Sequence, residues 1–209
     1  MEIYLPLFPL NLVVYPHEEL NLHIFEERYR QLISECLETG NTFGIPAFIN
    51  NKLPGFGTEM RVLALHKRYD DGRMDIKTIG TRIFRIATFE NPAPGKLYAG
   101  GLVEAVESEP EMGDDLDELV GKLTQLYRLL DVKSEIDRTT PLLSFRVAHK
   151  IGLSVEDEYK LLTLEHENER QRFLIRHLDR VLPVVSEMER TKDRIKMNGH
   201  FKNLDPLKF

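Results

Sequence analysis

The sequence has a single cysteine, Cys36, so it can form no internal disulfide and no cluster of thiolate metal ligands. It contains no apolar run of about 18 residues, which predicts that no transmembrane helix is present. The first residues also lack the basic segment and the small-residue cleavage site of a secretory signal. Together these absences predict a cytoplasmic protein.

Positive charge is not in excess. The net charge is −6 and the pI is about 5.7, whereas nucleic acids and anionic membranes attract proteins that carry basic surfaces. Both are therefore disfavoured as partners. The composition, 42% hydrophobic and 30% charged, is typical of a globular protein that buries a core.

The rest of the chain is organised around its apolar opening stretch, residues 6–29. Prolines in that stretch exclude one long helix, and Leu20, Leu22 and Ile24 alternate with polar residues as in a half-buried strand. Apolar residues then recur at helical spacing until Gly40, which predicts a helix with one apolar face. That face consists of Tyr29, Leu32, Ile33, Cys36 and Leu37.

Short strands are predicted between this helix and residue 107. Asp70-Asp71-Gly72 is a strong hairpin signal, and a turn-rich stretch runs from Asn91 to Gly95. Many short strands in a hundred-residue segment predict a small barrel or a strongly coiled sheet, with the helix covering one opening. The predicted strands span residues 43–49, 58–65, 74–80, 82–89 and 98–107.

The second half of the chain carries helical patterns only. An acidic stretch from Glu107 to Glu118 separates it from the strands. We therefore predict an α+β protein, with a β-barrel domain over residues 1–112 and a helical bundle domain over residues 113–209. The apolar tail from Asn198 to Phe209 either packs back on the bundle or forms a loose end.

Capping residues indicate where the predicted helices of this half begin and end. Thr140 and Pro141 suit the first positions of a helix that ends at Gly152. Ser154 opens the next helix with a pattern like a capping box. A longer helix follows from about residue 167, and Pro183 is expected to kink it because proline removes one backbone donor.

Several segments of the sequence resemble those of a known protein family. The segments Pro6-Leu7-Phe8-Pro9-Leu10, Val13-Val14-Tyr15-Pro16 and Leu22-His23-Ile24-Phe25-Glu26-Glu27-Arg28-Tyr29 are similar to the opening signature of the Lon protease amino-terminal domain family. Gly57-Thr58, Asp71-Gly72-Arg73 and the Gly80 to Ile86 segment fit the same pattern. The helical half is a weaker match, since Gln171 stands where leucine is more usual.

The resemblance implies a small barrel of the pseudouridine-synthase-and-archaeosine-transglycosylase-like (PUA-like) kind, followed by a helical bundle. In full-length Lon proteases this module holds unfolded or damaged polypeptide and carries out no chemistry. The sequence contains no Gly-x-x-x-x-Gly-Lys-Ser/Thr loop to bind a triphosphate. We therefore expect a stand-alone, ATP-independent member without the ATPase and peptidase domains, and no enzymatic activity or cofactor.

The residues themselves give little indication of catalysis. The seven histidines show no helical zinc spacing, and no serine lies in a nucleophile elbow, so no catalytic or metal site is predicted. Cys36 lies on the apolar helix face and is predicted to be a buried thiol.

Polypeptide binding is predicted at the mouth and the edges of the barrel, where a strand edge can also pair with a partner strand. Most of the candidate residues are expected to belong to the core, and about a third to be exposed. The candidates are Phe8, Leu10, Leu12, Val13, Tyr15, Phe43, Phe48, Phe56 and Tyr69.

Three functions remain open. The first is recognition of unfolded or apolar polypeptide, as an adaptor that delivers clients to a separate protease. The second is RNA binding through the barrel, for which Lys67, Arg68, Arg73, Arg82 and Arg85 would supply a local basic face. A cryptic hydrolase ranks last. The long helix and the apolar tail offer routes to a homo-oligomer, although no sustained heptad defines its order.

Overall fold

The computed structural model describes residues 2–106 and 115–200 of the chain. Most of the predicted acidic linker lies outside these residues. So do Phe201, Leu204, Leu207 and Phe209, the apolar residues of the predicted tail.

The chain forms two compact units. One consists of residues 1–111 together with residues 142–167, and the other holds the remaining residues. The predicted division at residue 112 separates strands from helices along the chain. The compact units do not follow this division, because the first unit contains the helical segment 142–167 in addition to the barrel.

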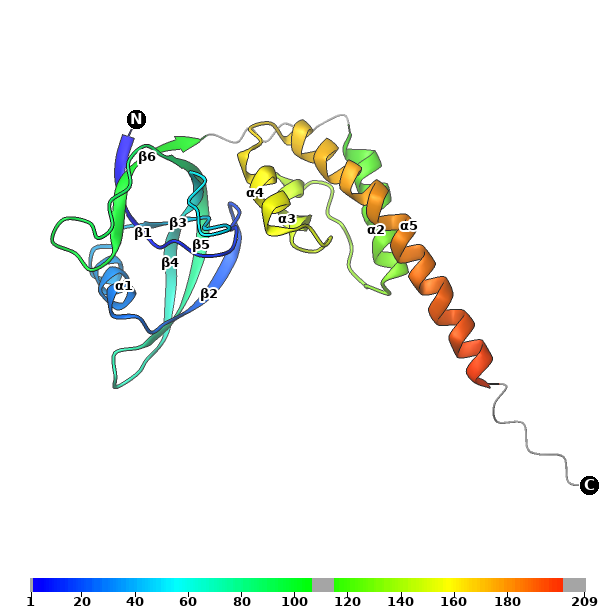
Figure 1. The fold of residues 1–209 in the computed structure, drawn as a ribbon, viewed down its shortest axis with the longest axis horizontal. Helices are drawn as coiled ribbons and strands as arrows, with labels where there is room; N and C mark the ends of the chain where they lie inside the picture. The colour runs from blue at the N-terminus through cyan, green and yellow to red at the C-terminus, as the bar shows by residue number, and fades with distance from the viewer. Residues whose placement is uncertain (1, 107–114, 201–209) are drawn as a thin grey trace, which may run out of the picture. The chain divides into compact units, whose positions relative to one another are not determined.

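Six strands form the sheet of the first unit, and five of them close into a small barrel (Figure 1). β5 pairs with β4 on one side. On its other side it pairs with β2 over its first half and with β6 over its second half. The ring β5–β4–β3–β1–β6 is therefore complete, and β2 extends the sheet beside it. The strands are β1 (Glu2–Leu7), β2 (Glu19–Ile24), β3 (Phe43–Pro46), β4 (Phe56–Arg68), β5 (Met74–Ile86) and β6 (Ala99–Val106).

β5 corrects the prediction of two shorter strands separated near Gly80. One strand continues through this glycine. Thr81 is an extra residue opposite the Glu59–Met60 step of β4, so the irregularity is a β-bulge. A Cβ atom at Gly80 would lie 2.3 Å from the carbonyl oxygen of Tyr15. The glycine therefore marks a bulge and a close backbone approach, not the end of a strand.

The helix α1 (Glu27–Thr39) buries the face that its periodicity predicts. Tyr29, Leu32, Ile33 and Cys36 are all buried. Each buried apolar side chain of this size contributes roughly 1.5–3 kcal/mol, so this face fixes the helix on the strands. The same core cluster contains Phe8, Val14, Ile24, Phe43, Ile45, Met60, Met74, Ile76 and Tyr98.

Two short helices of the first unit pack against the barrel. The ring of Tyr15 stacks on that of Phe145, with the ring centroids 4.8 Å apart. The ring of Phe56 meets that of Tyr159 edge-on, at a centroid distance of 6.3 Å. The opening stretch and β4 therefore provide the surface on which these helices lie. The helices are α3 (Leu143–Ala148) and α4 (Val155–Thr163).

The predicted boundaries of these two helices are confirmed in part. Ser154 Oγ accepts a hydrogen bond of 3.1 Å from the backbone N–H of Asp157, which confirms the predicted start of α4. The predicted helix from Pro141 to Gly152 is too long, since α3 has only six residues. Gly152 adopts φ = 76°, the left-handed conformation of a chain reversal.

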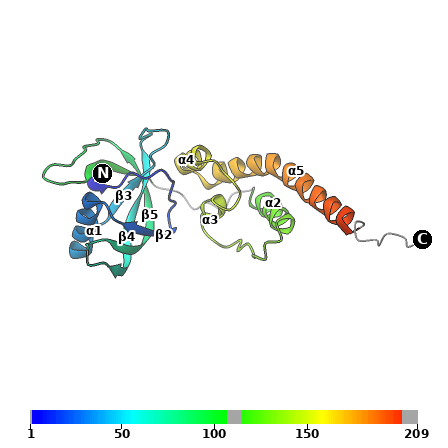
Figure 2. The same cartoon turned by 60° about the horizontal axis from the view of Figure 1, so that its bottom comes forward.

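The second unit is built from α2 (Leu116–Leu129) and α5 (Glu167–His200), which lie side by side in Figures 1 and 2. An ion pair joins Lys122 to Asp179 across the two helices. α5 runs through Pro183 without ending. Neither α5 nor any other helix among the described residues combines the length and the apolar character needed to cross a membrane.

Candidate functional site

An open pocket of about 230 Å³ lies where two loops of the barrel meet the start of α1. The loop after β3 forms one wall, and the loop between β5 and β6 forms the other. Most of the lining is apolar or aromatic, which is the character expected of a site for an apolar ligand. The lining residues are Pro9, Arg28, Tyr29, Phe48, Leu53, Phe89, Asn91 and Ala99.

Two stacked aromatic rings adjoin this pocket, and one of them, Tyr29, belongs to its lining. The ring of Tyr29 stacks on that of Phe8, with the centroids 3.7 Å apart, and both residues are buried. The guanidinium of Arg28 lies 4.5 Å from the centroid of the Tyr29 ring. Arg28 also pairs with Glu26 at 2.7 Å, so its position over the ring is fixed from two sides.

The wall after β3 is shaped by two left-handed asparagines. Asn50 and Asn51 adopt φ = 51° and 59°, which asparagine tolerates better than most residues. Ile49 and Lys52 exchange two backbone hydrogen bonds of 2.9 Å across them, so the turn is a two-residue hairpin. Phe48 and Leu53, which line the pocket, flank this hairpin.

The opposite wall is tied to α1 through Glu35. Its carboxylate accepts hydrogen bonds from Lys96 Nζ, at 2.8 Å, and from the hydroxyl of Tyr98. The hydrogen bond from Lys96, followed by that from Tyr98, lowers the pKa of Glu35. Gln31 of α1 also accepts a hydrogen bond from the backbone N–H of Leu97. Phe89, on the same loop, is 39% exposed at the pocket.

The nine candidate residues from the sequence do not gather in one site. Phe8, Val13, Tyr15 and Phe43 are buried and belong to the core. None of the nine is exposed, which corrects the expectation of about a third. The half-buried ones are Leu10, Leu12, Phe48, Phe56 and Tyr69.

Only Phe48 of these nine lines the pocket. Leu53 and Phe89 follow neither a strand nor a helix period, so the sequence does not predict them as lining residues. β5 ends at Ile86, whereas the predicted strand 82–89 ends at Phe89. Its position next to a turn-rich stretch was the one signal that could have suggested an exposed aromatic residue.

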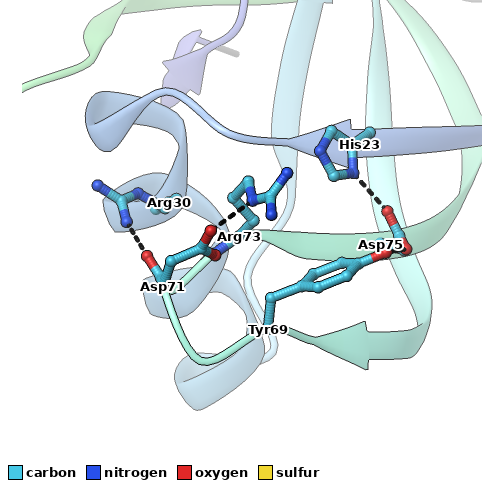
Figure 3. A network of polar contacts seen from close by, with 6 residues as sticks. All are labelled: His23, Arg30, Tyr69, Asp71, Arg73 and Asp75. Carbon is cyan, nitrogen blue, oxygen red and sulfur yellow. Dashed lines mark hydrogen bonds and ion pairs between the residues drawn. The ribbon is translucent and has the colours of Figure 1, made fainter.

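Tyr69 belongs to a polar network at the β4–β5 hairpin (Figure 3). Its hydroxyl donates to Asp75 at 2.7 Å, and His23 contacts the other oxygen of the same carboxylate at 2.6 Å. The hydrogen bond to Asp75 raises the pKa of the Tyr69 hydroxyl. This network holds β2 and the hairpin together.

The five basic residues considered for RNA binding are partly neutralised. Arg73, Arg82 and Arg85 are each paired with a carboxylate. Lys67 lies 4.3 Å from the centroid of the Tyr69 ring. The local basic face is thus interrupted by acidic partners, which weakens it as a surface for phosphate groups.

No cluster of three or more potential metal ligands occurs within residues 2–106 and 115–200. Cys36 is 4% exposed, and its burial raises the pKa of the thiol to about 11. A thiol with such a pKa is a weak nucleophile at neutral pH. The predicted buried thiol is confirmed.

Comparison with known proteins connects the chain to one family. Residues 4–180 match the model of the ATP-dependent protease La (LON) substrate-binding domain. A LON peptidase N-terminal domain and RING finger protein from Schizosaccharomyces pombe is 23% identical over 221 residues, covering 81% of this chain and 43% of that protein. The chain thus spans less than half the length of this curated relative.

Solved structures show the same fold. The crystal structure of a Lon N-terminal domain protein from Xanthomonas campestris has a TM-score of 0.66 and 27% identity, and the match covers 83% of this chain and 97% of that one. The N-terminal domain of a Mycobacterium avium complex Lon protease has a TM-score of 0.68 and 18% identity, covering 85% and 98%. The predicted fold class, a small barrel with a helix followed by a helical part, is confirmed.

Proposed function

Because this chain belongs to the family of Lon protease substrate-binding domains, we propose that it binds apolar segments of unfolded or damaged polypeptide and does so without catalysis. The observation that carries the proposal is the open pocket between α1 and the two loops, with Phe48, Leu53 and Phe89 in its walls. A bulky apolar side chain of a client would enter this pocket.

The physical basis of such binding is the removal of apolar surface from water. Burying one leucine or phenylalanine side chain contributes roughly 1.5–3 kcal/mol. Pocket walls that are held by hydrogen bonds and stacked rings lose little freedom on binding, which preserves this gain. A single pocket of this kind selects apolarity and size, and so suits clients that share no sequence.

We further propose that the bound segment is presented to a separate protease, with the chain acting as an adaptor. Membership in a family of substrate-binding domains supports this role. The helical second unit is the part of the chain that would contact such a partner. Co-purification from native cells at moderate salt would identify the partner.

The pocket is tested by replacing Phe89 with serine. Binding of a labelled, reduced and carboxymethylated α-lactalbumin is measured by fluorescence anisotropy. Phe89→Ser should weaken binding about tenfold, since it removes a large apolar contact. The matched control is Leu63→Ser, because Leu63 is 42% exposed but lies on β4 and lines no part of this pocket. Equal losses in both variants, or none in either, would contradict the assignment.

A further inference from the structure

A second hollow, of about 640 Å³, adjoins the outer face of α1. Four residues of α1 form its floor at helical spacing, and the β4–β5 hairpin and the loop before β6 form its sides. We refer to it as the trough. Its lining residues are Glu27, Arg30, Gln31, Ser34, Arg68, Gly72, Gly95, Lys96 and Leu97.

Arg30 enters this trough without a carboxylate partner. Its Nη1 donates to the backbone carbonyl oxygen of Asp71 at 2.6 Å, while its buried Nε has no hydrogen-bond partner among the described residues. The carboxylate of Asp71 is occupied by Arg73, which contacts it at 2.7 Å (Figure 3). Asp71 therefore makes its ion pair with Arg73, and its charge compensates that of Arg30 only in part.

The other charges of the trough leave a positive surplus. Arg68 is exposed and forms no ion pair with any residue the structure describes. Lys96 is held by Glu35, so these two charges offset each other. Glu27 is the one acidic side chain in the lining. Two guanidinium groups that form no ion pair with the described residues thus share the trough with one carboxylate, an arrangement that favours binding of a further anion.

We propose that the trough binds an acidic side chain of the client polypeptide, so that the protein prefers apolar segments flanked by aspartate or glutamate. This inference rests on the proposed function and deepens it. A guanidinium binds a carboxylate through two parallel N–H···O bonds, which supply both strength and orientation. Arg68 and Arg30 are the residues that recognise the client's acid.

The trough and the apolar pocket share two segments of the chain, and each has one further wall, the β4–β5 hairpin for the trough and the loop after β3 for the pocket. α1 contributes Arg28 and Tyr29 to the pocket and Arg30 to the trough. The loop between β5 and β6 contributes Phe89 to the pocket and Leu97 to the trough. Residues 28 and 29 lie on a different face of α1 from the trough residues. In the proposed binding mode, one extended client passes around α1 and places an apolar side chain in the pocket and an acidic one in the trough.

The lining favours a polypeptide over RNA as the source of the anion. Leu97 is 52% exposed at the trough and offers apolar contact beside the charges. The presence of Glu27 and the net charge of −6 disfavour a continuous phosphate backbone. A single carboxylate next to an apolar residue matches both features.

The test uses two fluorescein-labelled peptides with the same central Phe-Leu anchor, one flanked on both sides by Asp and Glu and the other by Asn and Gln. The full chain should bind the acidic peptide about tenfold more tightly, because hydrogen bonds to charged groups are the stronger ones. Arg68→Gln and Arg30→Gln should each reduce this preference, and together abolish it. Arg61→Gln is the matched control, since Arg61 is exposed on β4 outside the trough.

Four outcomes are distinguishable. Loss of the preference in Arg68→Gln, with Arg61→Gln unchanged, supports the proposal even if Arg30→Gln fails to fold. Equal binding of both peptides overturns it and leaves the apolar pocket in place. Failure of both peptides to bind overturns the proposed function as well. Displacement of the acidic peptide by a single-stranded RNA at physiological salt would assign the trough to phosphate groups and overturn the peptide assignment.

Discussion

The hydroxyl of Tyr15 donates a hydrogen bond of 3.0 Å to the backbone carbonyl oxygen of Glu158, 143 residues further along the chain. This bond joins the opening stretch of the barrel to α4. Tyr15 is 1% exposed, and its burial, reinforced by the nearby carboxylates of Glu158 and Glu18, raises the pKa of its hydroxyl. The hydroxyl therefore stays protonated and remains a donor at all physiological pH values.

We predict that Tyr15→Phe lowers the free energy of unfolding by about 1 kcal/mol, since it removes one hydrogen bond and retains the ring. Urea denaturation followed by circular dichroism measures the change. Tyr4→Phe is the control, because Tyr4 is 48% exposed and its bond to Glu90 lies at the surface. A change in Tyr4→Phe as large as that in Tyr15→Phe would contradict this reading.

His149 makes the stability of the first unit depend on pH. Its ring lies 3.1 Å from Glu18 Oε2 and 2.7 Å from Glu158 Oε1. The hydrogen bond to Glu18, with the further contribution of Glu158, raises the pKa of His149 to about 9. The folded state thus holds this proton more tightly than the unfolded state, in which the pKa is about 6.5.

The stabilisation from His149 is therefore complete below pH 6.5 and disappears as the pH rises through about 9. We expect a loss of about 1 kcal/mol over this interval, because the side chain is 35% exposed and water screens the pair. Thermal unfolding at pH 6 and pH 9.5 measures it. In His149→Gln the difference between the two pH values should shrink, and an unchanged difference would assign the pH dependence to other groups.

Replacement of two glycines by alanine should change the free energy of unfolding in opposite directions. A Cβ atom at Gly101 in β6 would lie 1.9 Å from the backbone carbonyl oxygen of Thr88. Gly101→Ala should therefore destabilise the barrel by about 1–3 kcal/mol. Gly121 lies within α2 with no atom within 4 Å of such a Cβ, so Gly121→Ala should stabilise by about 0.5–1 kcal/mol. Urea denaturation of both variants measures whether each substitution stabilises or destabilises the protein. Destabilisation by Gly121→Ala would show that the glycine in α2 is required by its surroundings.

Local periodicity predicted the elements that have one buried face. The face of α1 was predicted correctly at Tyr29, Leu32, Ile33 and Cys36, because a helix repeats every 3.6 residues regardless of what it packs against. The hairpin at Asp71 and Gly72 was also predictable, since Gly72 adopts φ = 84°, where glycine is favoured.

The interruption of β5 was wrongly predicted for a physical reason. A glycine in a strand pattern signals either an end or a bulge, and only the partner strand distinguishes the two. The close approach of the Tyr15 carbonyl oxygen to Gly80 is a contact between distant segments. Nothing in the local sequence carries that information.

In the candidate site, too, local sequence predicts some features, and contacts between distant segments determine the others. Apolarity alone suggested Phe8 and Phe43 as binding residues, yet the closed barrel buries both. Leu53 and Phe89 lie in loops without a period, and they meet only because hairpin turns and the Glu35 contacts bring their loops to α1. The positive surplus at Arg30 depends likewise on Arg73 occupying the carboxylate of Asp71.

The sequence by itself determined the α+β class, the apolar face of α1 and the family to which the opening stretch points, because these depend on residue type and spacing along the chain. The tertiary structure alone decided which apolar residues remain open, that α3 and α4 lie with the barrel, and which arginines form no ion pair with the described residues. Burial and charge pairing are set by contacts between segments far apart in sequence, such as Tyr15 with Glu158. No local pattern encodes contacts of that kind.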